Sequence, residues 1–387
     1  MPHVILPKLP LPELPREVGE FTFEFASPAK EAYGIIGVRY QEFRFLLHYF
    51  PHQNGVILKV DKTTRIPHLN IVKRSLAALV ELAGVKPSQS NIQITKPDRT
   101  YRALKSADFF AKEYAYEREI WVEIGFGSGR HLLHNANTHS DIDHLGVEIH
   151  KPSIEQVLKQ CELQDLDNVS VIALDARVVL ETLRSNSVGR IFVHFPVPWD
   201  KAPHRRVMHP AFIQEAIRVL KPGGTLELRT DSREYFEYSL GLLNDLQRCD
   251  FQGWKNRELA VSSKYEDRWK RMERDIFDLI FVNRENSEPL ETQTDYGFDD
   301  IRITYAEAVE KLKEQIIAQD SILLKMSLHH PLPGDDGMIK LVLGPIQFPQ
   351  TIFLYIRNRL PQYYPEAPLS IPENRLAHEA LVNLLKA

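Results

Sequence analysis

The sequence predicts an α/β protein built on a doubly wound sheet, with smaller α+β units before and after it. Three observations predict this fold. Between residues 120 and 283, five short apolar segments alternate with helical or polar stretches. A glycine-rich turn directly follows the first of these segments. The length of 387 residues also exceeds one usual domain of about 150 residues.

The chain divides into five parts. Five prolines within the first 16 residues predict an extended arm over 1–19, without a helix or a central strand. An α+β unit follows over 20–95, with strands at 21–26, 42–50 and 56–60 and a helix at 70–84. The doubly wound domain takes 96–283, an acidic linker 284–302, and a second α+β unit 303–387.

Within the doubly wound domain, we expect strands at 120–126, 144–149, 169–174, 190–195 and 225–230. Ser153 and Gln156 form a capping-box pattern for a helix that starts at 154. Pro210 suits the first turn of the helix that follows it. In the last unit, the pattern predicts a helix at 305–319, a turn region at 328–337, strands at 339–344 and 351–358, and a helix at 375–387.

Composition excludes several classes of protein. No stretch approaches the roughly 18 apolar residues of a membrane helix, so we expect no membrane association. The only cysteines, Cys161 and Cys249, are too far apart in sequence for a disulfide framework or a thiolate metal site, which favours a reducing, cytoplasmic location. The net charge of −4 indicates no uniformly basic nucleic-acid binder.

The strongest chemical signal is the segment EIGFGSG at 123–129. Gly125, Gly127 and Gly129 follow an apolar strand, and Glu123 precedes the first glycine by two positions. A dinucleotide-binding loop has its third glycine three positions after the second, whereas here the spacing is two. Alone, such a loop can be a purely structural turn. This form resembles motif I of the class I S-adenosylmethionine methyltransferases, which implies that cofactor and that Rossmann-like fold.

Two further acids follow later strands. Glu148 ends the second strand, where a carboxylate can accept hydrogen bonds from both ribose hydroxyls. Asp175 follows the third strand, where the resemblance implies a contact near the adenine. Each acid alone could be a helix cap or a solvated strand end. Three acids in register with the glycine loop favour a cofactor site.

Downstream motifs narrow the resemblance to one family. The segments FPVPWDKAPHRR at 195–206, LKPGG at 220–224, Thr230-Asp231 and SSKYEDR at 262–268 resemble the tRNA (guanine-N7)-methyltransferases over about residues 118–283. The resemblance implies that Glu123, Glu148 and Asp175 bind S-adenosylmethionine. It also implies that the tRNA guanosine is bound by Lys201, Asp231, Ser263, Lys264, Tyr265 and Glu266.

One position departs from the family. Val197 stands where the family usually has the aspartate assigned to the active site, and valine cannot accept a hydrogen bond. Asp200 and Asp231 are the carboxylates that could replace it as catalytic residues. Guanine N7 carries no proton, so its methylation needs alignment and electrostatics rather than a general base. Trp199 or Tyr265 could stack on the base, although a tryptophan in such a loop can equally be a packing residue.

Charge is distributed unevenly along the chain. The linker at 284–302 has a net charge of −4, which equals the imbalance of the whole chain. Residues 200–206 have a net charge of +2 through Lys201, Arg205 and Arg206, and residues 96–105 have +3. A third basic group lies between Lys264 and Arg274. Each group could be a solvated face, but two of them flank the predicted methyl-transfer site, which favours tRNA as the partner.

Histidines do not suggest a metal site. His131 and His134 lie three residues apart on the helix after the glycine loop, and His139 and His144 follow, but no motif supplies further ligands in a fixed geometry. We expect surface or capping histidines and no metal.

The sequence therefore favours a tRNA (guanine-N7)-methyltransferase that uses S-adenosylmethionine to form 7-methylguanosine in the variable loop of tRNA. Two alternatives stay open at this point. One is a catalytically silent RNA-binding or partner-binding protein that kept the fold; the other is a methyltransferase of small molecules. No pattern indicates the oligomeric state.

Overall fold

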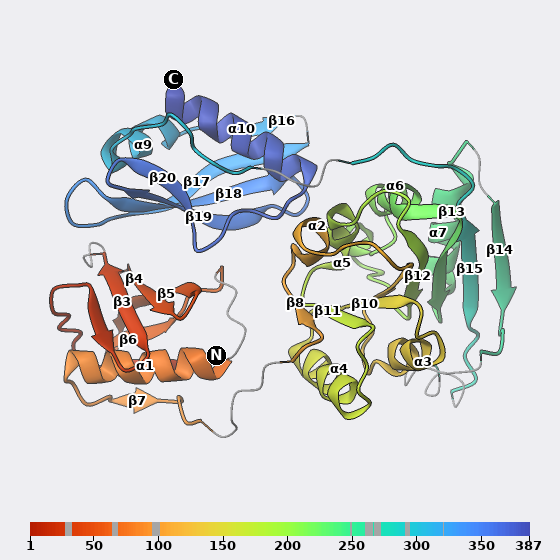
Figure 1. Cartoon of the computed structure of the whole chain (residues 1–387), viewed down its shortest axis with the longest axis horizontal. Helices are drawn as coiled ribbons and strands as arrows, with labels where there is room; N and C mark the ends of the chain where they lie inside the picture. The colour runs from red at the N-terminus through yellow and green to blue at the C-terminus, as the bar shows by residue number, and fades with distance from the viewer. Residues whose placement is uncertain are drawn as a thin grey trace. The chain divides into compact units, whose positions relative to one another are not determined.

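The computed structural model describes residues 1–27, 33–63, 69–94, 101–247, 250–259, 266, 272–290, 295–319 and 321–387. The chain divides into two compact units (Figure 1). One unit comprises 100–294 together with 369–371, and the other comprises 1–99, 295–368 and 372–387. We describe each unit by itself.

The unit at 100–294 contains an eight-stranded sheet in the order β14-β15-β13-β12-β9-β10-β11-β8. Strands β8 to β13 run parallel, whereas β15 is antiparallel to both of its neighbours. The strands are β8 Leu104–Lys105, β9 Ile120–Ile124, β10 Asp143–Val147, β11 Val169–Ile172, β12 Val188–His194, β13 Leu220–Thr230, β14 Asp250–Lys255 and β15 Phe277–Val282. The helices are α2 Phe109–Lys112, α3 Arg130–Thr138, α4 Lys151–Leu163, α5 Ala176–Val179, α6 Pro210–Val219 and α7 Arg233–Asn244, with 3₁₀ turns at Leu180–Thr182 and Pro203–Arg205.

This sheet confirms the predicted doubly wound fold. The five predicted apolar segments form β9 to β13, and β9 is buried along its whole length, as expected for a strand covered on both faces. The chain runs outward through β10 and β11, then returns to β12 and β13 on the other side of β9. The connection direction therefore reverses between β9 and β12, and ligands of such sheets bind at the carboxyl ends of the strands at this point.

Two helix starts test the predicted caps of this unit. Pro210 lies in the first turn of α6, as predicted. The capping box predicted for α4 is wrong: the helix begins at Lys151 with His150 as its N-cap residue, because Pro152 is accommodated within the first turn. The hydroxyl of Ser153 instead contacts His150 Nδ1 at 3.0 Å.

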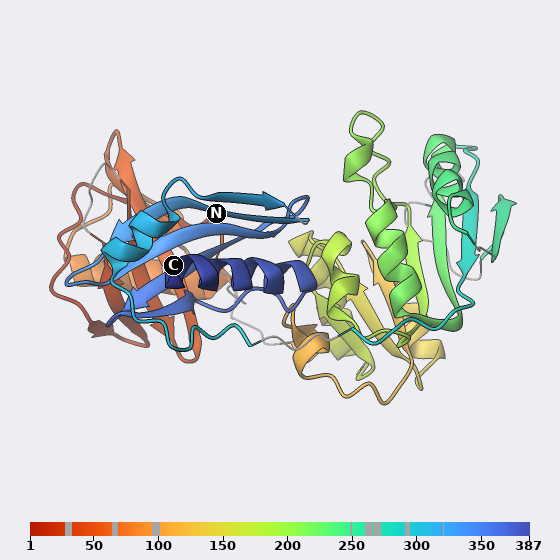
Figure 2. The same cartoon turned by 90° about the horizontal axis from the view of Figure 1, so that it is seen from above.

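The second unit contains two antiparallel sheets. The seven-stranded sheet has the order β2-β3-β4-β5-β6-β1-β7 and the five-stranded sheet runs β16-β17-β18-β19-β20. The first sheet has β1 His3–Leu6, β2 Arg16–Val18, β3 Phe21–Ala26, β4 Gly34–Tyr40, β5 Phe43–His52, β6 Gly55–Val60 and β7 Gln89–Ser90, with helix α1 Leu69–Ala83. The second has β16 Ile316–Gln319, β17 Ile322–Pro331, β18 Gly337–Pro345, β19 Gln350–Arg357 and β20 Leu360–Tyr364, with helices α9 Tyr305–Leu312 and α10 Pro372–Lys386. Figures 1 and 2 show α10 along the second sheet.

The two predicted α+β units share part of their cores. Helix α1 covers one face of the first sheet, and α9 and α10 pack on the second sheet. A further apolar cluster joins residues of both sheets, including Phe25, Ile35 and Leu46 of the first and Met338 and Phe353 of the second. The segments at the two ends of the chain therefore fold as one unit.

Three predictions outside the doubly wound domain are wrong. The proline-rich arm contains β1, which lies between β6 and β7, because Pro2 and Pro7 only bracket four residues that are free to pair. The linker is not fully solvated, since Phe298 and Ile301 are buried in the core of the second sheet. The predicted helix at 305–319 ends at Leu312, and its last residues form β16, while β17 extends into the predicted turn region.

Candidate active site

The carboxyl ends of the parallel strands meet at one edge of the sheet. Ile124 of β9 lies beside Val147 of β10 and Val193 of β12, and the same level continues to Ile172 of β11 and Leu228 of β13. The glycine loop, the three predicted cofactor acids, the loop 195–206 and Asp231 all belong to this edge. The sheet thus brings motifs from more than 100 residues of sequence to one place.

The glycines of the loop serve different purposes. Gly125, Gly127 and Gly129 all have positive φ angles, of 68°, 53° and 73°. A Cβ atom on Gly125 or Gly127 would meet open space or only a distant atom of the loop, so this backbone is accessible to a ligand. A Cβ atom on Gly129 would collide with Val157 of α4. The third glycine therefore allows close helix packing rather than ligand approach.

Glu148 fixes the loop while keeping capacity for a ligand. Its Oε2 accepts a hydrogen bond from the Gly127 amide at 3.1 Å. Its Oε1 accepts from the amides of Ile149 and His150 at 2.8 and 2.9 Å. A carboxylate offers about four acceptor positions, so one remains for a hydroxyl donor. The half-buried Glu148 fits the ribose-binding role that the resemblance implies.

Glu123 lies at the end of β9 and is only 5% exposed. Its Oε2 is 2.8 Å from Nδ1 of His131, the second residue of α3. Burial lowers the pKa of His131, but the Glu123 carboxylate outweighs this effect, so the pKa is raised above its ordinary value. The prediction that His131 is a surface or capping residue is wrong, because its side chain is mostly buried against Glu123.

Asp175 occupies the neighbouring strand end. It lies three residues after β11 and directly precedes α5. Its backbone carbonyl accepts a hydrogen bond from the Val178 amide at 3.3 Å. Asp175 is therefore at the helix start where the sequence also allowed a capping role.

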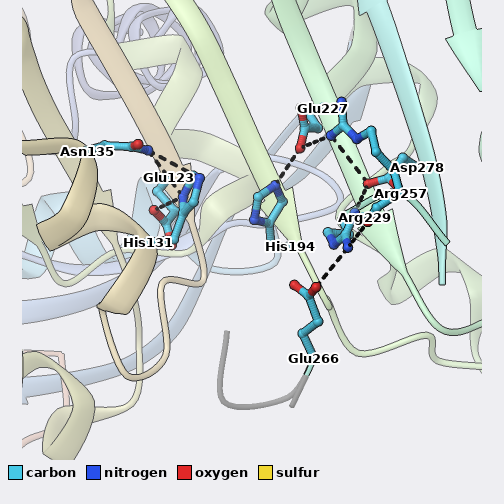
Figure 3. Close-up of polar contacts among 9 residues, drawn as sticks. All are labelled: Glu123, His131, Asn135, His194, Glu227, Arg229, Arg257, Glu266 and Asp278. Carbon is cyan, nitrogen blue, oxygen red and sulfur yellow. Dashed lines mark hydrogen bonds and ion pairs between the residues drawn. The ribbon is translucent and has the colours of Figure 1, made fainter. Parts of the chain in front are cut away.

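Further polar side chains form a largely buried network on β12, β13 and β15, on the other side of β9 from Asp175 (Figure 3). His194 Nε2 lies 3.0 Å from Glu227 Oε1, which also accepts a hydrogen bond from Arg257 at 3.0 Å. Burial raises the pKa of Glu227, but His194 and Arg257 outweigh it and lower the pKa to about 2. Arg229 is fully buried and donates to Asp278 and, at 3.0 Å, to Glu266.

Sequence reasoning missed most of this network. Glu227 and Arg229 alternate with apolar residues along β13, so they resemble the solvent face of a strand, and their spacing of two predicts one common face. His194 ends the apolar run of β12, and its position in the sequence does not relate it to them. Glu266, predicted to bind the guanosine, is 1% exposed in this network.

The loop after β12 carries the predicted substrate residues. Val197 is 60% exposed, so the position at which the family has its aspartate faces outward and the valine leaves no buried charge unpaired. Trp199 is partly exposed, and the Arg205 guanidinium lies 4.6 Å from the centre of its ring. Lys201 is exposed. These side chains form the accessible surface beside the cofactor edge.

Arg206 has a different role from that expected. It is 2% exposed and donates to the Pro198 carbonyl at 2.7 Å and to Glu234 of α7 at 3.0 Å. Its guanidinium also lies 4.7 Å from the centre of the Tyr238 ring. Of the basic group at 200–206, Lys201 and Arg205 are therefore exposed, while Arg206 anchors the loop.

The two candidate carboxylates are both held by arginines. Asp231 directly follows β13 and accepts a hydrogen bond from Arg274 at 3.0 Å. Asp200 is more exposed, and its Oδ1 lies 3.7 Å from Arg206. Ser263, Lys264 and Tyr265 lie outside the described residues.

The basic group at 96–105 is only partly described. Lys96 and Arg99 lie outside the described residues. Arg102 is paired with Asp165 at 3.2 Å, and Lys105 lies over the ring of Phe109. The structure thus gives local partners to both described members of this group.

Two other kinds of feature, a metal site and a membrane-spanning helix, are absent from the described residues. No three histidine, cysteine, aspartate or glutamate side chains among them are grouped so that they could hold a metal ion. Within the same residues, no helix has the length and apolar character needed to cross a membrane.

Known proteins resemble this chain at two levels. Residues 117–279 match the family described as "Putative methyltransferase". Solved structures of an antibiotic-related methyltransferase and of an rRNA methylase from Streptococcus thermophilus are 17% and 13% identical in sequence to this chain. They cover 43% and 46% of this chain and 87% and 94% of their own, with TM-scores of 0.35 and 0.33.

Relatives of similar length match almost the whole chain. The tRNA (guanine-N(7)-)-methyltransferase of Wolinella succinogenes is 37% identical, over 98% of this chain and 99% of the relative. Proteins of the same name from Helicobacter pylori and Helicobacter hepaticus are 36% and 34% identical, over all of this chain and 98% and 99% of theirs. The match includes both terminal regions, which the sequence motifs alone did not cover. The chain therefore belongs to the tRNA (guanine-N7)-methyltransferase family.

Proposed function

We propose that the protein is an S-adenosylmethionine-dependent enzyme that methylates N7 of a guanosine in the variable loop of tRNA, forming 7-methylguanosine. The observation that carries the proposal is the shared edge of the sheet, where the glycine loop and its acids lie beside the loop 195–206. Relatives named for this activity match the chain from end to end. An enzyme of tRNA with two isolated cysteines fits a cytoplasmic location.

The residues at the edge fit the cofactor. The backbone at Gly125 and Gly127 is open to a ligand, and Glu148 retains an acceptor position for a ribose hydroxyl. Glu123 would meet the amino-acid part of the cofactor, and Asp175 the adenine side. When bound, S-adenosylmethionine supplies an electrophilic methyl group, whose bond to sulfur breaks as the N7 lone pair forms the new carbon–nitrogen bond.

The chain's own contribution is alignment and charge. N7 of guanine has no proton, so no side chain needs to act as a general base. Lys201 and Arg205 would hold tRNA phosphates, and Trp199 could lie against a base. Positive charge develops on the purine ring during transfer, so a nearby carboxylate would stabilise the transition state.

Asp231 and Asp200 are the carboxylates proposed for that role in place of the residue at Val197. Asp231 is the less exposed of the two and has the closer arginine contact, with Arg274 at 3.0 Å. We expect Asp231→Ala or Asp200→Ala to lower kcat by about ten-fold or more while changing tRNA affinity little. Wild-type rates in both variants would leave alignment alone as the source of catalysis.

Cells that lack the protein test the function directly. Nucleoside mass spectrometry of their tRNA should show a loss of 7-methylguanosine, restored by the wild-type protein and not by Glu123→Ala. Glu155→Ala is the matched control, because Glu155 is an exposed glutamate on α4. Unchanged 7-methylguanosine in cells without the protein, and with no second enzyme of this activity, would contradict the proposal.

A further inference from the structure

His131 is a largely buried titratable group beside Glu123, and the proposed function does not use it. It is the second residue of α3, so the helix that begins at the glycine loop directs it back toward β9. Its Nδ1 lies 2.8 Å from Oε2 of Glu123, and both side chains are largely buried. The contact occupies one oxygen of Glu123 and leaves Oε1 for another partner.

The position of His131 is fixed from several sides. Its ring centre lies 4.7 Å from that of Phe192 and 4.6 Å from that of His194, both on β12. The amide of Asn135, one turn later on α3, lies 3.2 Å from its Nε2. Figure 3 shows His131 between Glu123 and His194. A ring enclosed in this way has little freedom to leave Glu123.

The strand register explains why these groups meet. Phe192 of β12 lies beside Glu123 of β9 and beside Glu227 of β13. Side chains at paired positions of neighbouring strands lie on the same face, and His194, two residues after Phe192, shares that face. The two carboxylates are therefore on either side of β12, and each faces one histidine: Glu123 faces His131 and Glu227 faces His194.

The charges around His131 favour its protonated form. The groups that face it are Glu123 from β9, His194 from β12, and Glu227 and Arg229 from β13. Burial lowers the pKa of His131 and Arg229 acts in the same direction, but the two carboxylates outweigh them, so the pKa is raised. An imidazolium also makes a stronger hydrogen bond to a carboxylate than a neutral ring does.

We propose that His131 is a positioning residue, which holds Oε2 of Glu123 and so presents Oε1 to the amino-acid part of S-adenosylmethionine. This inference rests on the proposed role of Glu123 in cofactor binding. His131 itself does not touch the cofactor or the reacting atoms. The role assigned to it is to hold a buried carboxylate in one orientation, which a binding site of fixed geometry requires.

Binding of S-adenosylhomocysteine tests the proposal without any chemical step. By isothermal titration calorimetry, we expect His131→Leu to bind about ten-fold or more weakly than the wild type, because a hydrogen bond to a charged group is lost. His131→Gln keeps a donor and should bind within a few-fold of the wild type. His134→Leu removes a half-exposed histidine of the same helix that lies outside the network described above, and it should bind as the wild type does.

A second readout covers the case in which His131→Leu does not fold. In the folded wild type, NMR titration should give His131 a pKa above the ordinary histidine value of about 6.5. Glu123→Gln should lower that pKa, since the carboxylate that raises it is removed. A His131 pKa that does not change in Glu123→Gln would overturn the proposal, as would unweakened binding by a folded His131→Leu.

The outcomes separate this proposal from the proposed function. Suppose that His131→Leu binds S-adenosylhomocysteine more weakly but the wild type forms no 7-methylguanosine on tRNA. This result would support the positioning role of His131 and contradict the proposed tRNA substrate. Formation of 7-methylguanosine by the wild type, together with unweakened binding in His131→Leu, would support the proposed function and contradict the positioning role of His131. A wild-type protein that does not bind S-adenosylhomocysteine would contradict both.

Discussion

Two adjacent arginines show how differently residues of one basic motif are used. Arg205 lies at the surface over Trp199, where it is available to phosphate. Arg206 is buried and joins the Pro198 carbonyl to Glu234. Burial separates the tRNA-binding role proposed for Arg205 from the structural role of Arg206, and the residue types of the motif do not show this difference.

Substitution of each arginine by leucine should separate these roles. Arg206→Leu should lower the free energy of unfolding by about 2 kcal/mol, because the Pro198 carbonyl and the Glu234 carboxylate both lose a donor. Arg205→Leu should leave stability nearly unchanged but weaken tRNA binding, and reduce the slope of log affinity against log salt by about 1. Urea unfolding and filter binding at several salt concentrations measure these effects. Equal stability of the two variants would contradict the assignment.

Glu227 should make stability depend on acid pH. Its pKa in the folded protein is lowered to about 2, below the unfolded value, which is near 4.5. Its contribution is therefore fully present above the unfolded pKa and is lost as the pH falls toward 2, and a shift of this size corresponds to about 3 kcal/mol.

We expect the unfolding free energy of the wild type to fall more steeply between pH 4.5 and 2.5 than that of Glu227→Gln. The difference should approach one proton taken up on unfolding. Denaturant unfolding at a series of pH values measures both slopes. Parallel slopes would mean that His194 and Arg257 do not hold Glu227 ionised.

At the scale of elements, the glycine loop joins β9 to α3 and meets two different demands. Gly127→Ala should bind S-adenosylhomocysteine more weakly, because a methyl group then occupies the open backbone, with a stability loss of about 1 kcal/mol for the positive φ. Gly129→Ala should lose more stability, since its methyl group also collides with Val157 on α4. Thermal unfolding with and without S-adenosylhomocysteine measures the stability and the ligand binding of each variant. A larger stability loss in Gly127→Ala would contradict this division.

Sequence patterns predicted β9 to β13 well, because each is a short apolar run between turn residues, but they did not predict β8, β14 or β15 of the same sheet. They predicted less well those segments whose residues suit both a helix and a strand. Ile316 and Ile317 continue the helical spacing of α9, yet they pair with β17 as β16, since sheet pairing outweighs local helix propensity. Tertiary pairing of this kind leaves no trace in a single sequence.

The candidate site could be predicted only in part for a similar reason. Glu123 and Glu148 stand out because they flank strand ends next to glycines. His131 and Glu227 do not, because their roles depend on which strands are neighbours and on how α3 lies over them. The order of strands in the sheet, rather than the order of residues in the chain, produces that network.

At the scale of the whole molecule, the two compact units should respond separately to change. Phe353 is fully buried in the cluster that joins the two sheets of the terminal unit. Phe353→Ala should lower the stability of that unit by about 3–5 kcal/mol. S-adenosylhomocysteine at 100 times its Kd should stabilise only the other unit, by about 2.7 kcal/mol.

Calorimetry of the full chain should therefore show a transition shifted by the ligand and another shifted by Phe353→Ala. Leu328→Ala is the matched control, because Leu328 lies on β17 with a more exposed side chain. A single transition moved equally by the ligand and by Phe353→Ala would mean that the chain unfolds as one cooperative body.

The most direct test of methyl transfer to guanine N7 uses purified protein, S-adenosylmethionine with a deuterated methyl group, and an unmodified tRNA transcript. We predict deuterated 7-methylguanosine in the variable loop by nuclease digestion and mass spectrometry. A transcript made with 7-deazaguanosine, which lacks the N7 atom, should accept no methyl group. A wild-type protein that binds the cofactor and the tRNA but forms no 7-methylguanosine, or that methylates the 7-deaza transcript equally, would contradict the claim.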